Sequence, residues 1–179
     1  KNWIFLEGIN DSGKGEIAVS TLHSSEFTAC ETVLTIDSHL SFPFIFSYGG
    51  KYFMIPESSK SNANIIYQCQ SFPYEWSKLH SILPEYRIVD PIIFQRGELW
   101  WLLFSANSLT PLGKYSEMYA FYSESPISGD WNTHNCNPLF IDFTRGRNGG
   151  FFSFGGEDYR VSQEYSDGKY GQCFRIHQI

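Results

Sequence analysis

The sequence predicts an all-β fold made of repeated antiparallel units, and three observations lead to this prediction. Aromatic residues make up 18% of the 179 residues, and strands favour aromatic and β-branched side chains. An apolar motif recurs roughly every 50 positions along the chain, which is typical of repeat architectures. No segment carries a 3.6-residue apolar period with capping residues, so we expect very little helix.

The repeated motif is an apolar run that forms one half of a hairpin. Residues 1–7 match residues 51–57 in character at every position, and residues 98–104 and 157–163 continue the series. The last three copies each follow a glycine-containing turn. Before these turns stand further apolar runs, at residues 42–46, 91–94 and 151–154. Two apolar runs around a short glycine turn predict a β-hairpin.

A third segment follows each hairpin and alternates more clearly between apolar and polar residues. These third strands are predicted at residues 16–21, 64–70, 118–123 and 170–176. Short fourth strands are predicted at residues 78–83 and 133–138. The boundaries that we predict for the four units are residues 1–38, 39–86, 87–140 and 141–179.

Units of this size and composition are typical of β-propeller blades. A single blade cannot bury both of its faces, so neighbouring blades must stack, and we expect aromatic side chains to fill the space between them. The first unit begins at its second strand. We therefore expect an incomplete five-bladed β-propeller-like domain with about four blades present. A β-sandwich with a similar number of strands is the alternative.

Composition and motifs exclude several classes of function. The net charge of −6 argues against binding to nucleic acid, and the longest apolar stretches are too short for membrane insertion. The histidines and cysteines show no metal-ligand spacing, and no Walker loop or Gly-x-Ser-x-Gly elbow occurs. We thus expect no metal and no cofactor. An acidic chain without a visible leader leads us to expect a cytoplasmic protein.

Polar residues stand at one end of several repeats, where a propeller would gather them near its axis. At the ends of the second strands lie Glu7, Glu57, Phe104 and Gln163. Just before or at the start of the first strands lie His39, Ser41, Asp90, Arg147 and Asn148. Each has a purely structural alternative: Glu57 would bond its own loop, and Asp90, before a proline, would start a turn. Their recurrence together favours a binding site.

Six short motifs resemble one family. They are 39–46 (HLSFPFIF), 52–58 (YFMIPES), 89–91 (VDP), 147–150 (RNGG), 162–164 (SQE) and 170–171 (YG). Together they are similar to the N-terminal domain of glucosamine inositolphosphorylceramide transferase and its bacterial relatives. The resemblance covers essentially the whole chain. It implies a five-bladed propeller similar to glycoside hydrolase families 43 and 32.

The motifs and the resemblance together leave three alternative functions. The first is a carbohydrate-recognition domain of glycoconjugate biosynthesis, with a transferase domain attached in the full-length chain and a sugar or sugar conjugate as partner. Its candidate contacts are His39, Ser41, Arg147, Asn148, Gln163, Glu164 and Tyr170. The second is a glycoside hydrolase with Asp90 and Glu57 as the catalytic carboxylate pair, although Phe42 stands where that family has a further Asp. The third is a structural propeller without a small-molecule site. An enzyme of this family would be a glycosidase or part of a glycosyltransferase.

Overall fold

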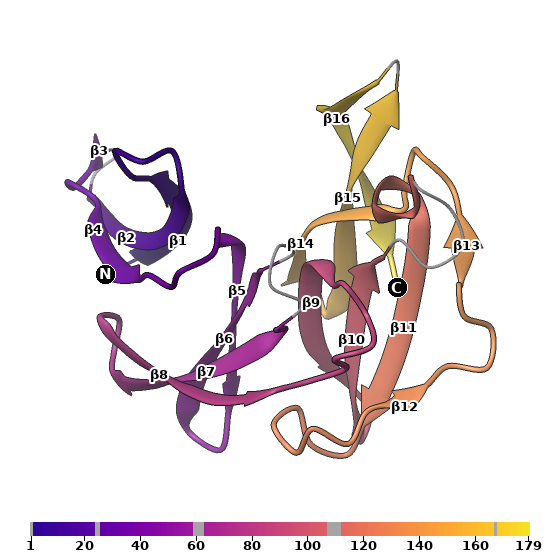
Figure 1. Cartoon of the computed structure of the whole chain (residues 1–179). Coiled ribbons are helices and arrows are strands. Elements are labelled where there is room, and N and C mark those ends of the chain that lie inside the picture. The colour runs from indigo at the N-terminus through magenta and orange to yellow at the C-terminus, as the bar shows by residue number, and fades with distance from the viewer. Residues whose placement is uncertain (1, 24–25, 59–62, 107–111, 167) are drawn as a thin grey trace. The chain divides into compact units, whose positions relative to one another are not determined.

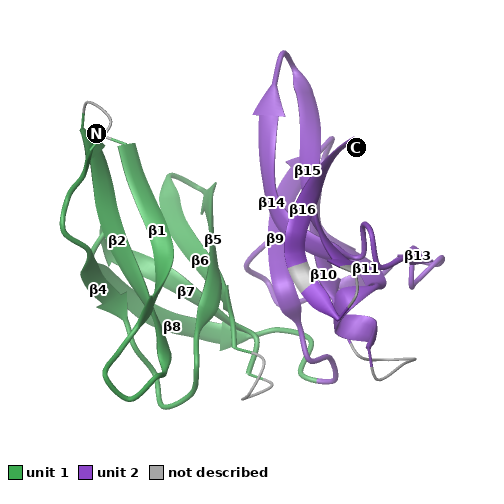
Figure 2. Cartoon of the chain, turned by 90° about the horizontal axis from the view of Figure 1, so that it is seen from above, with its two compact units in different colours: residues 1–84 green, residues 85–179 purple. Residues whose placement is uncertain are grey.

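The computed structural model describes residues 2–23, 26–58, 63–106, 112–166 and 168–179. These residues form strands β1–β16 and one short 3-10 helix, η1 (Gly113–Tyr115), in agreement with the predicted all-β class (Figure 1). The chain divides into two compact units, residues 1–84 and residues 85–179 (Figure 2). Within the described ranges, no helix has the length and apolar character needed to cross a membrane.

Unit 1 contains two antiparallel sheets. The strands of the first sheet are β1 (Asn2–Ile9), β2 (Gly15–His23), β3 (Glu26–Phe27) and β4 (Glu31–Leu34), with β2 pairing with the other three. The strands of the second are β5 (Ser41–Tyr48), β6 (Lys51–Glu57), β7 (Ile65–Ser71) and β8 (Glu75–Ser81), paired in sequence order. The hairpin β5–β6 turns at Gly49 and Gly50, whose φ angles of 57° and 73° suit glycine.

The two sheets of unit 1 share one apolar core. Ile17 and Leu34 from the first sheet pack with Met54 and Tyr67 from the second, and all four are buried. At the edge of this core, Trp3 meets the rings of the β7–β8 turn edge-on, with 5.8 Å between its centroid and that of Tyr74. These rings therefore pack between sheets, as the repeat predicted.

Unit 2 also contains two antiparallel sheets. The strands of the first are β9 (Val89–Arg96), β10 (Leu99–Ser105), β11 (Glu117–Ser123), β12 (Asn132–Thr133) and β13 (Phe140–Ile141); β12 and β13 both pair with β11. The strands of the second are β14 (Arg147–Phe154), β15 (Glu157–Ser166) and β16 (Lys169–Gln178), paired in sequence order. Phe94 on β9 stacks on Phe151 on β14, with ring centroids 4.8 Å apart.

A bulge recurs at the same place in three of the hairpins. Each bulge is followed, on the side away from the turn, by one residue pair across the hairpin. These pairs are Ser41 with Glu57, Val89 with Ser105, and Arg147 with Gln163. The prediction that Phe104 is the counterpart of Glu57 is therefore wrong by one residue. Glu98 belongs to the turn and β10 begins at Leu99. The alignment that starts at Glu98 is therefore shifted by one residue, and Ser105 occupies the position of Glu57.

Candidate functional site

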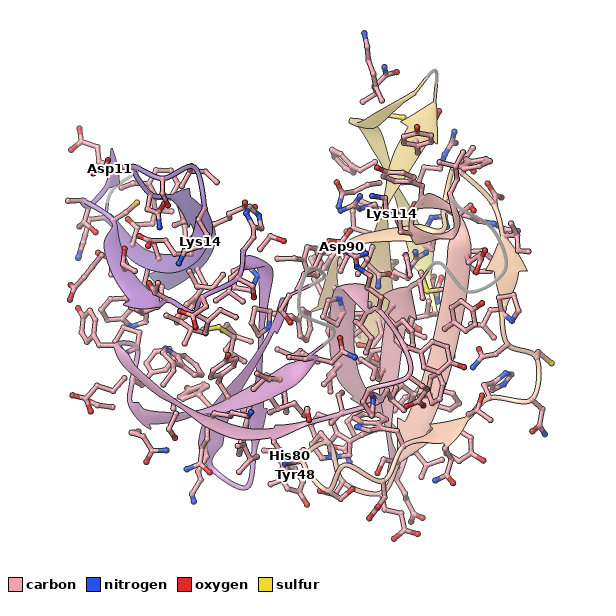
Figure 3. The ribbon with its side chains drawn as sticks, in the orientation of Figure 1. Asp11, Lys14, Tyr48, His80, Asp90 and Lys114 are labelled. Carbon is pink, nitrogen blue, oxygen red and sulfur yellow. The ribbon has the colours of Figure 1, made fainter. Side chains whose placement is uncertain are left out.

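Asp90 and Arg147 form a nearly buried ion pair in unit 2. Asp90, which Figure 3 labels, lies at the start of β9, and only 2% of its surface is exposed. Arg147, at the start of β14, donates from Nε to Asp90 Oδ2 at 2.5 Å and from a terminal nitrogen to Oδ1 at 3.5 Å. Such two-point pairing fixes the plane of the guanidinium group. Asp90 adopts a φ of 48°, so the bulge holds it in a conformation that non-glycine residues rarely adopt.

Gln163 and Asn148 complete the polar cluster around this pair. Gln163 is the cross-strand neighbour of Arg147, and its Nε2 donates to the carbonyl of Asn148 at 2.6 Å. Asn148 is fully buried, and its Nδ2 donates to the carbonyls of Asp90 (2.7 Å) and Leu103 (3.1 Å). Its Oδ1 accepts from Arg160 Nε at 2.6 Å. Asn148, on β14, thus connects its own strand to β9, β10 and β15.

Aromatic rings border the cluster. The Arg147 guanidinium lies 5.5 Å from the ring centroid of Tyr115 at the end of η1, and Tyr115 stacks on Tyr165 of β15 with centroids 4.1 Å apart. The amino group of Lys114, labelled in Figure 3, lies 4.9 Å from the same Tyr115 ring. This border combines an amphipathic aromatic face with two cations.

The candidates in unit 1 form a separate set of contacts. His39 Nδ1 accepts from the backbone N–H of Gly15 at 2.9 Å, and its Nε2 lies 3.0 Å from Glu7 Oε1. This bonding places a proton on Nε2. Ser41 and Glu57 are cross-strand partners. Because Glu57 belongs to unit 1 and Asp90 to unit 2, their action as a carboxylate pair stays a prediction.

Two further candidates are Glu164 on β15 and Tyr170 on β16. Glu164 accepts from Arg175 at 2.7 Å and from the Cys173 thiol at 3.0 Å. Tyr170 pairs with Tyr165 through the backbone, but its side chain lies outside the described part of the structure. Their roles as sugar contacts stay predictions. The described residues contain no group of three or more His, Cys, Asp or Glu side chains suited to hold a metal ion.

Sequence reasoning missed Arg160 and Tyr115. Arg160 and Ser162 are both buried on β15, so strand alternation places an arginine on the inward face; that period-2 pattern was the available signal. Tyr115 lies in a connection between β10 and β11 and has no counterpart in the repeat. No local pattern pointed to it.

Comparison with known proteins shows the family and the fold. The family model described as "Glucosamine inositolphosphorylceramide transferase 1, N-terminal" matches residues 2–179. The transferase of that name from Oryza sativa subsp. japonica is 37% identical over 144 residues, which are 79% of this chain and 19% of the relative. The chain therefore spans about a fifth of the length of the relatives that it matches.

Solved structures of glycoside hydrolases share the fold. A thermostable family-43 glycoside hydrolase aligns with 98% of this chain and 67% of its own, at a TM-score of 0.72 and 14% identity. A Bombyx mori family-32 β-fructofuranosidase aligns with 90% of this chain and 40% of its own, at a TM-score of 0.61 and 13% identity. These likenesses confirm the predicted propeller-type fold, with four sheets as blades, and show the fold alone. With its sequence matched from residue 2 to residue 179, the chain belongs to the family of glucosamine inositolphosphorylceramide transferase 1 N-terminal domains.

Proposed function

We propose that this chain is the sugar-recognising part of a larger protein of glycoconjugate biosynthesis, to which a transferase domain is attached. Membership of the family supports the link with glycoconjugate biosynthesis. The relatives are named for glucosamine and for inositolphosphorylceramide, both of which carry polyhydroxylated rings. The proposed contact surface is formed by Arg147, Gln163 and Tyr115 in unit 2.

The observation that carries the proposal is the cross-strand pair of Arg147 and Gln163, backed by Asp90. Sugar hydroxyl groups both donate and accept hydrogen bonds, and an amide and a guanidinium group together offer an acceptor and several donors. Asp90 fixes the guanidinium plane before any ligand arrives, which reduces the entropy lost on binding. The ring of Tyr115 beside Arg147 supplies an apolar face of the kind that packs against the C–H groups of a pyranose.

Asp90 and Asn148 act in this proposal as positioning residues. Only 3% of the Asp90 side chain is exposed. Its Oδ2 accepts from both Arg147 and Gln163, and its Oδ1 accepts from Arg147. Asn148 is fully buried and bonds the Asp90 carbonyl. A ligand at the surface would thus meet Arg147 and Gln163, while Asp90 and Asn148 hold them in place.

Saturation-transfer NMR with glucosamine, N-acetylglucosamine and myo-inositol tests the proposal. We expect one of these probes to bind, and we expect Arg147→Lys to weaken that binding about tenfold, because lysine keeps the charge but loses the two-point geometry. Arg175→Lys is the matched control, since Arg175 is also an arginine paired with a carboxylate in unit 2. Absence of binding to all three probes, or equal loss in both variants, would contradict the proposal.

The glycosidase alternative has its own experiment. A glycosidase needs two carboxyl groups roughly 5–10 Å apart across a pocket. The likeness of the fold to family-43 and family-32 enzymes is the reason for testing this alternative. Release of 4-nitrophenol from chromogenic glycosides, abolished by both Asp90→Asn and Glu57→Gln, would support it. Activity that survives either substitution would remove those residues from the catalytic role.

A further inference from the structure

A cavity with basic walls lies in unit 2, formed by residues of β10, β11, β15 and β16 and of the segment 139–145. Its volume is about 270 Å³. Three of its lining side chains carry or can carry positive charge: Arg145, Arg160 and His177. The other lining residues are mainly apolar and include Phe140. We refer to this space as the cationic cavity.

Arg160 is a buried cation whose charge no carboxylate balances. It is 4% exposed, and its bonds reach only the side-chain oxygen of Asn148 and the carbonyl of Arg145, both at 2.6 Å. Among the described residues, no carboxylate lies within ion-pair distance of it. Burying a charge that has no partner of opposite sign is costly. The cavity that Arg160 lines is where such a partner would fit.

A second arginine converges on the same place. The guanidinium carbons of Arg145 and Arg160 lie 4.7 Å and 5.8 Å from the ring centroid of Phe140. Burial, and next the charge of Arg145, lower the pKa of Arg160 to about 10. Asp142 pairs with Arg145 at 2.9 Å, which leaves Arg160 without a carboxylate partner among the described residues.

His177 provides a third donor position. Its Nε2 lies 2.9 Å from Ser162 Oγ, so the ring is held against β15. Burial lowers the pKa of His177, and the charges of Arg160, Arg145 and Arg175 lower it further, while Asp142 opposes them. The surroundings of the ring therefore disfavour additional positive charge and favour negative charge.

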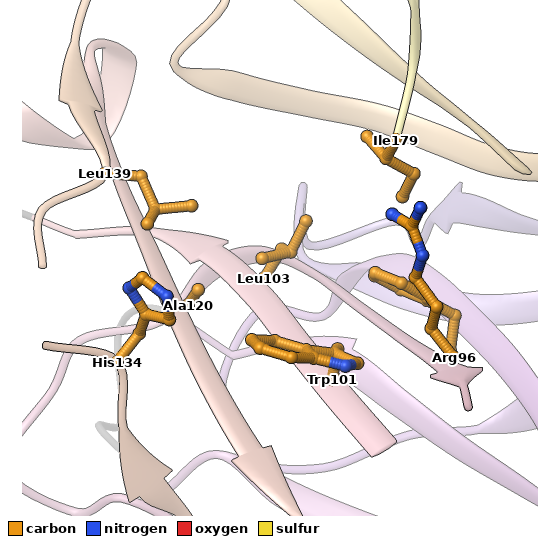
Figure 4. Close-up of a pocket in the computed structure, with 8 residues that line it drawn as sticks. Arg96, Trp101, Leu103, Ala120, His134, Leu139 and Ile179 are labelled. Atoms are coloured by element: carbon orange, nitrogen blue, oxygen red, sulfur yellow. The ribbon is translucent and has the colours of Figure 1, made fainter. Parts of the chain in front are cut away.

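We propose that the cationic cavity is a binding site for a phosphate-type oxyanion, held by Arg145 and Arg160 and bordered by His177. Guanidinium forks match the oxygen geometry of phosphate groups, and an anion between two arginines removes their mutual repulsion. A neighbouring hollow, whose lining residues Figure 4 draws, has a volume of about 220 Å³ and shares Leu103, Leu139 and Ile179 with the cavity. Because the walls of that hollow are mostly apolar, the oxyanion belongs on the arginine side.

A titration of the 179-residue chain with sodium phosphate at constant ionic strength, followed by NMR of the arginine Nε–H and histidine ring signals, tests the site. We expect saturable shifts at Arg160 and His177. Arg145→Gln should weaken phosphate binding about tenfold or more, as loss of a charge-assisted contact does. It leaves the Arg145 carbonyl, and thus the anchor of Arg160, in place. Arg160→Gln is the less useful variant because it leaves the buried Oδ1 of Asn148 without the guanidinium donor.

Arg175→Gln is the matched control for Arg145→Gln. The two side chains are 49% and 51% exposed, and each pairs with one carboxylate, but Arg175 does not line the cavity. Equal loss of phosphate affinity in both variants would overturn the proposal. So would NMR shifts that rise linearly with phosphate concentration without saturating and disappear when salt is added. Acetate is expected to bind more weakly than phosphate, and equal binding would overturn the phosphate assignment. Glucose 6-phosphate against inorganic phosphate then distinguishes a phosphorylated sugar from the free ion as the source.

Discussion

Replacing Asn148 by alanine removes a buried amide that uses its oxygen and both of its N–H bonds. Two carbonyl oxygens, those of Asp90 and Leu103, lose a donor, and Arg160 Nε loses its acceptor. The site has no exposed surface, so these three groups do not readily regain water. Each buried group left without a partner costs about 1–3 kcal/mol. The expected loss in the free energy of unfolding is about 3–5 kcal/mol.

Asn137→Ala is the comparison that isolates burial. Asn137 also makes three side-chain hydrogen bonds, two with the backbone of Ala120 and one with Thr133, but it is partly exposed. Water can replace much of what its side chain supplies, so we expect a loss of about 1–1.5 kcal/mol. Both substitutions lie in unit 2 and therefore report on the same unfolding transition.

Urea denaturation followed by tryptophan fluorescence measures both losses, with the m-value checked for constancy. The reasoning requires that the loss for Asn148→Ala exceed that for Asn137→Ala by at least about 1.5 kcal/mol. Equal losses would show that burial of the amide is not what makes Asn148 matter, and that the count of hydrogen bonds alone sets the cost.

Three further predictions concern stability. Gly146→Ala should lower the melting temperature strongly, because a Cβ there overlaps facing backbone, whereas Gly8→Ala, whose new Cβ meets its neighbours at 3.7 Å or more, should have little effect. Burial lowers the pKa of His80 from 6.5 in the folded state, so the unfolded chain binds more protons. His80 therefore makes the free energy of unfolding fall as the pH drops below about 6.5. His80→Gln should reduce this pH dependence in urea denaturation measured at several pH values. Phe94→Ala should cost about 3–5 kcal/mol because its ring stacks between two sheets, and the same truncation of Phe154, which is 74% exposed, should cost less than about 0.5 kcal/mol in the same assay.

Sequence predicted the hairpins because their signals are local. Gly49 and Gly50 adopt positive φ angles between two apolar runs, and such turns can be predicted from a few consecutive residues. The bulges could not be predicted from the sequence, because a bulge depends on how the partner strand is paired. The predicted counterpart of Glu57, Phe104, is wrong by one residue for another reason: Glu98 belongs to the turn, so β10 begins at Leu99 and Ser105 holds that position.

The polar cluster was predictable as a set of positions but not as a set of bonds. The repeat singled out Asp90, Arg147 and Gln163, and the structure joins these three by hydrogen bonds. Arg160, which bonds Asn148, and Tyr115, which lies against Arg147, were not predicted. A bond between β9 and β15 spans more than 70 residues of chain (Gln163 to Asp90, 73 residues), and only tertiary packing decides it.

One position of the repeat shows how a common backbone carries different chemistry. Phe42, Asp90 and Asn148 each stand at the bulge, next to the pair that Ser41, Val89 or Arg147 makes across its hairpin. The first is an apolar ring, the second forms the ion pair with Arg147, and the third bonds the carbonyl of the second. Phe42 and Asp90 share a positive φ, 45° and 48°, although one side chain is apolar and the other is charged, whereas Asn148 does not have a positive φ. The hairpins thus share the strand pairing at the bulge. The residue at this position determines whether it offers an apolar ring, a charge or hydrogen bonds to neighbouring strands.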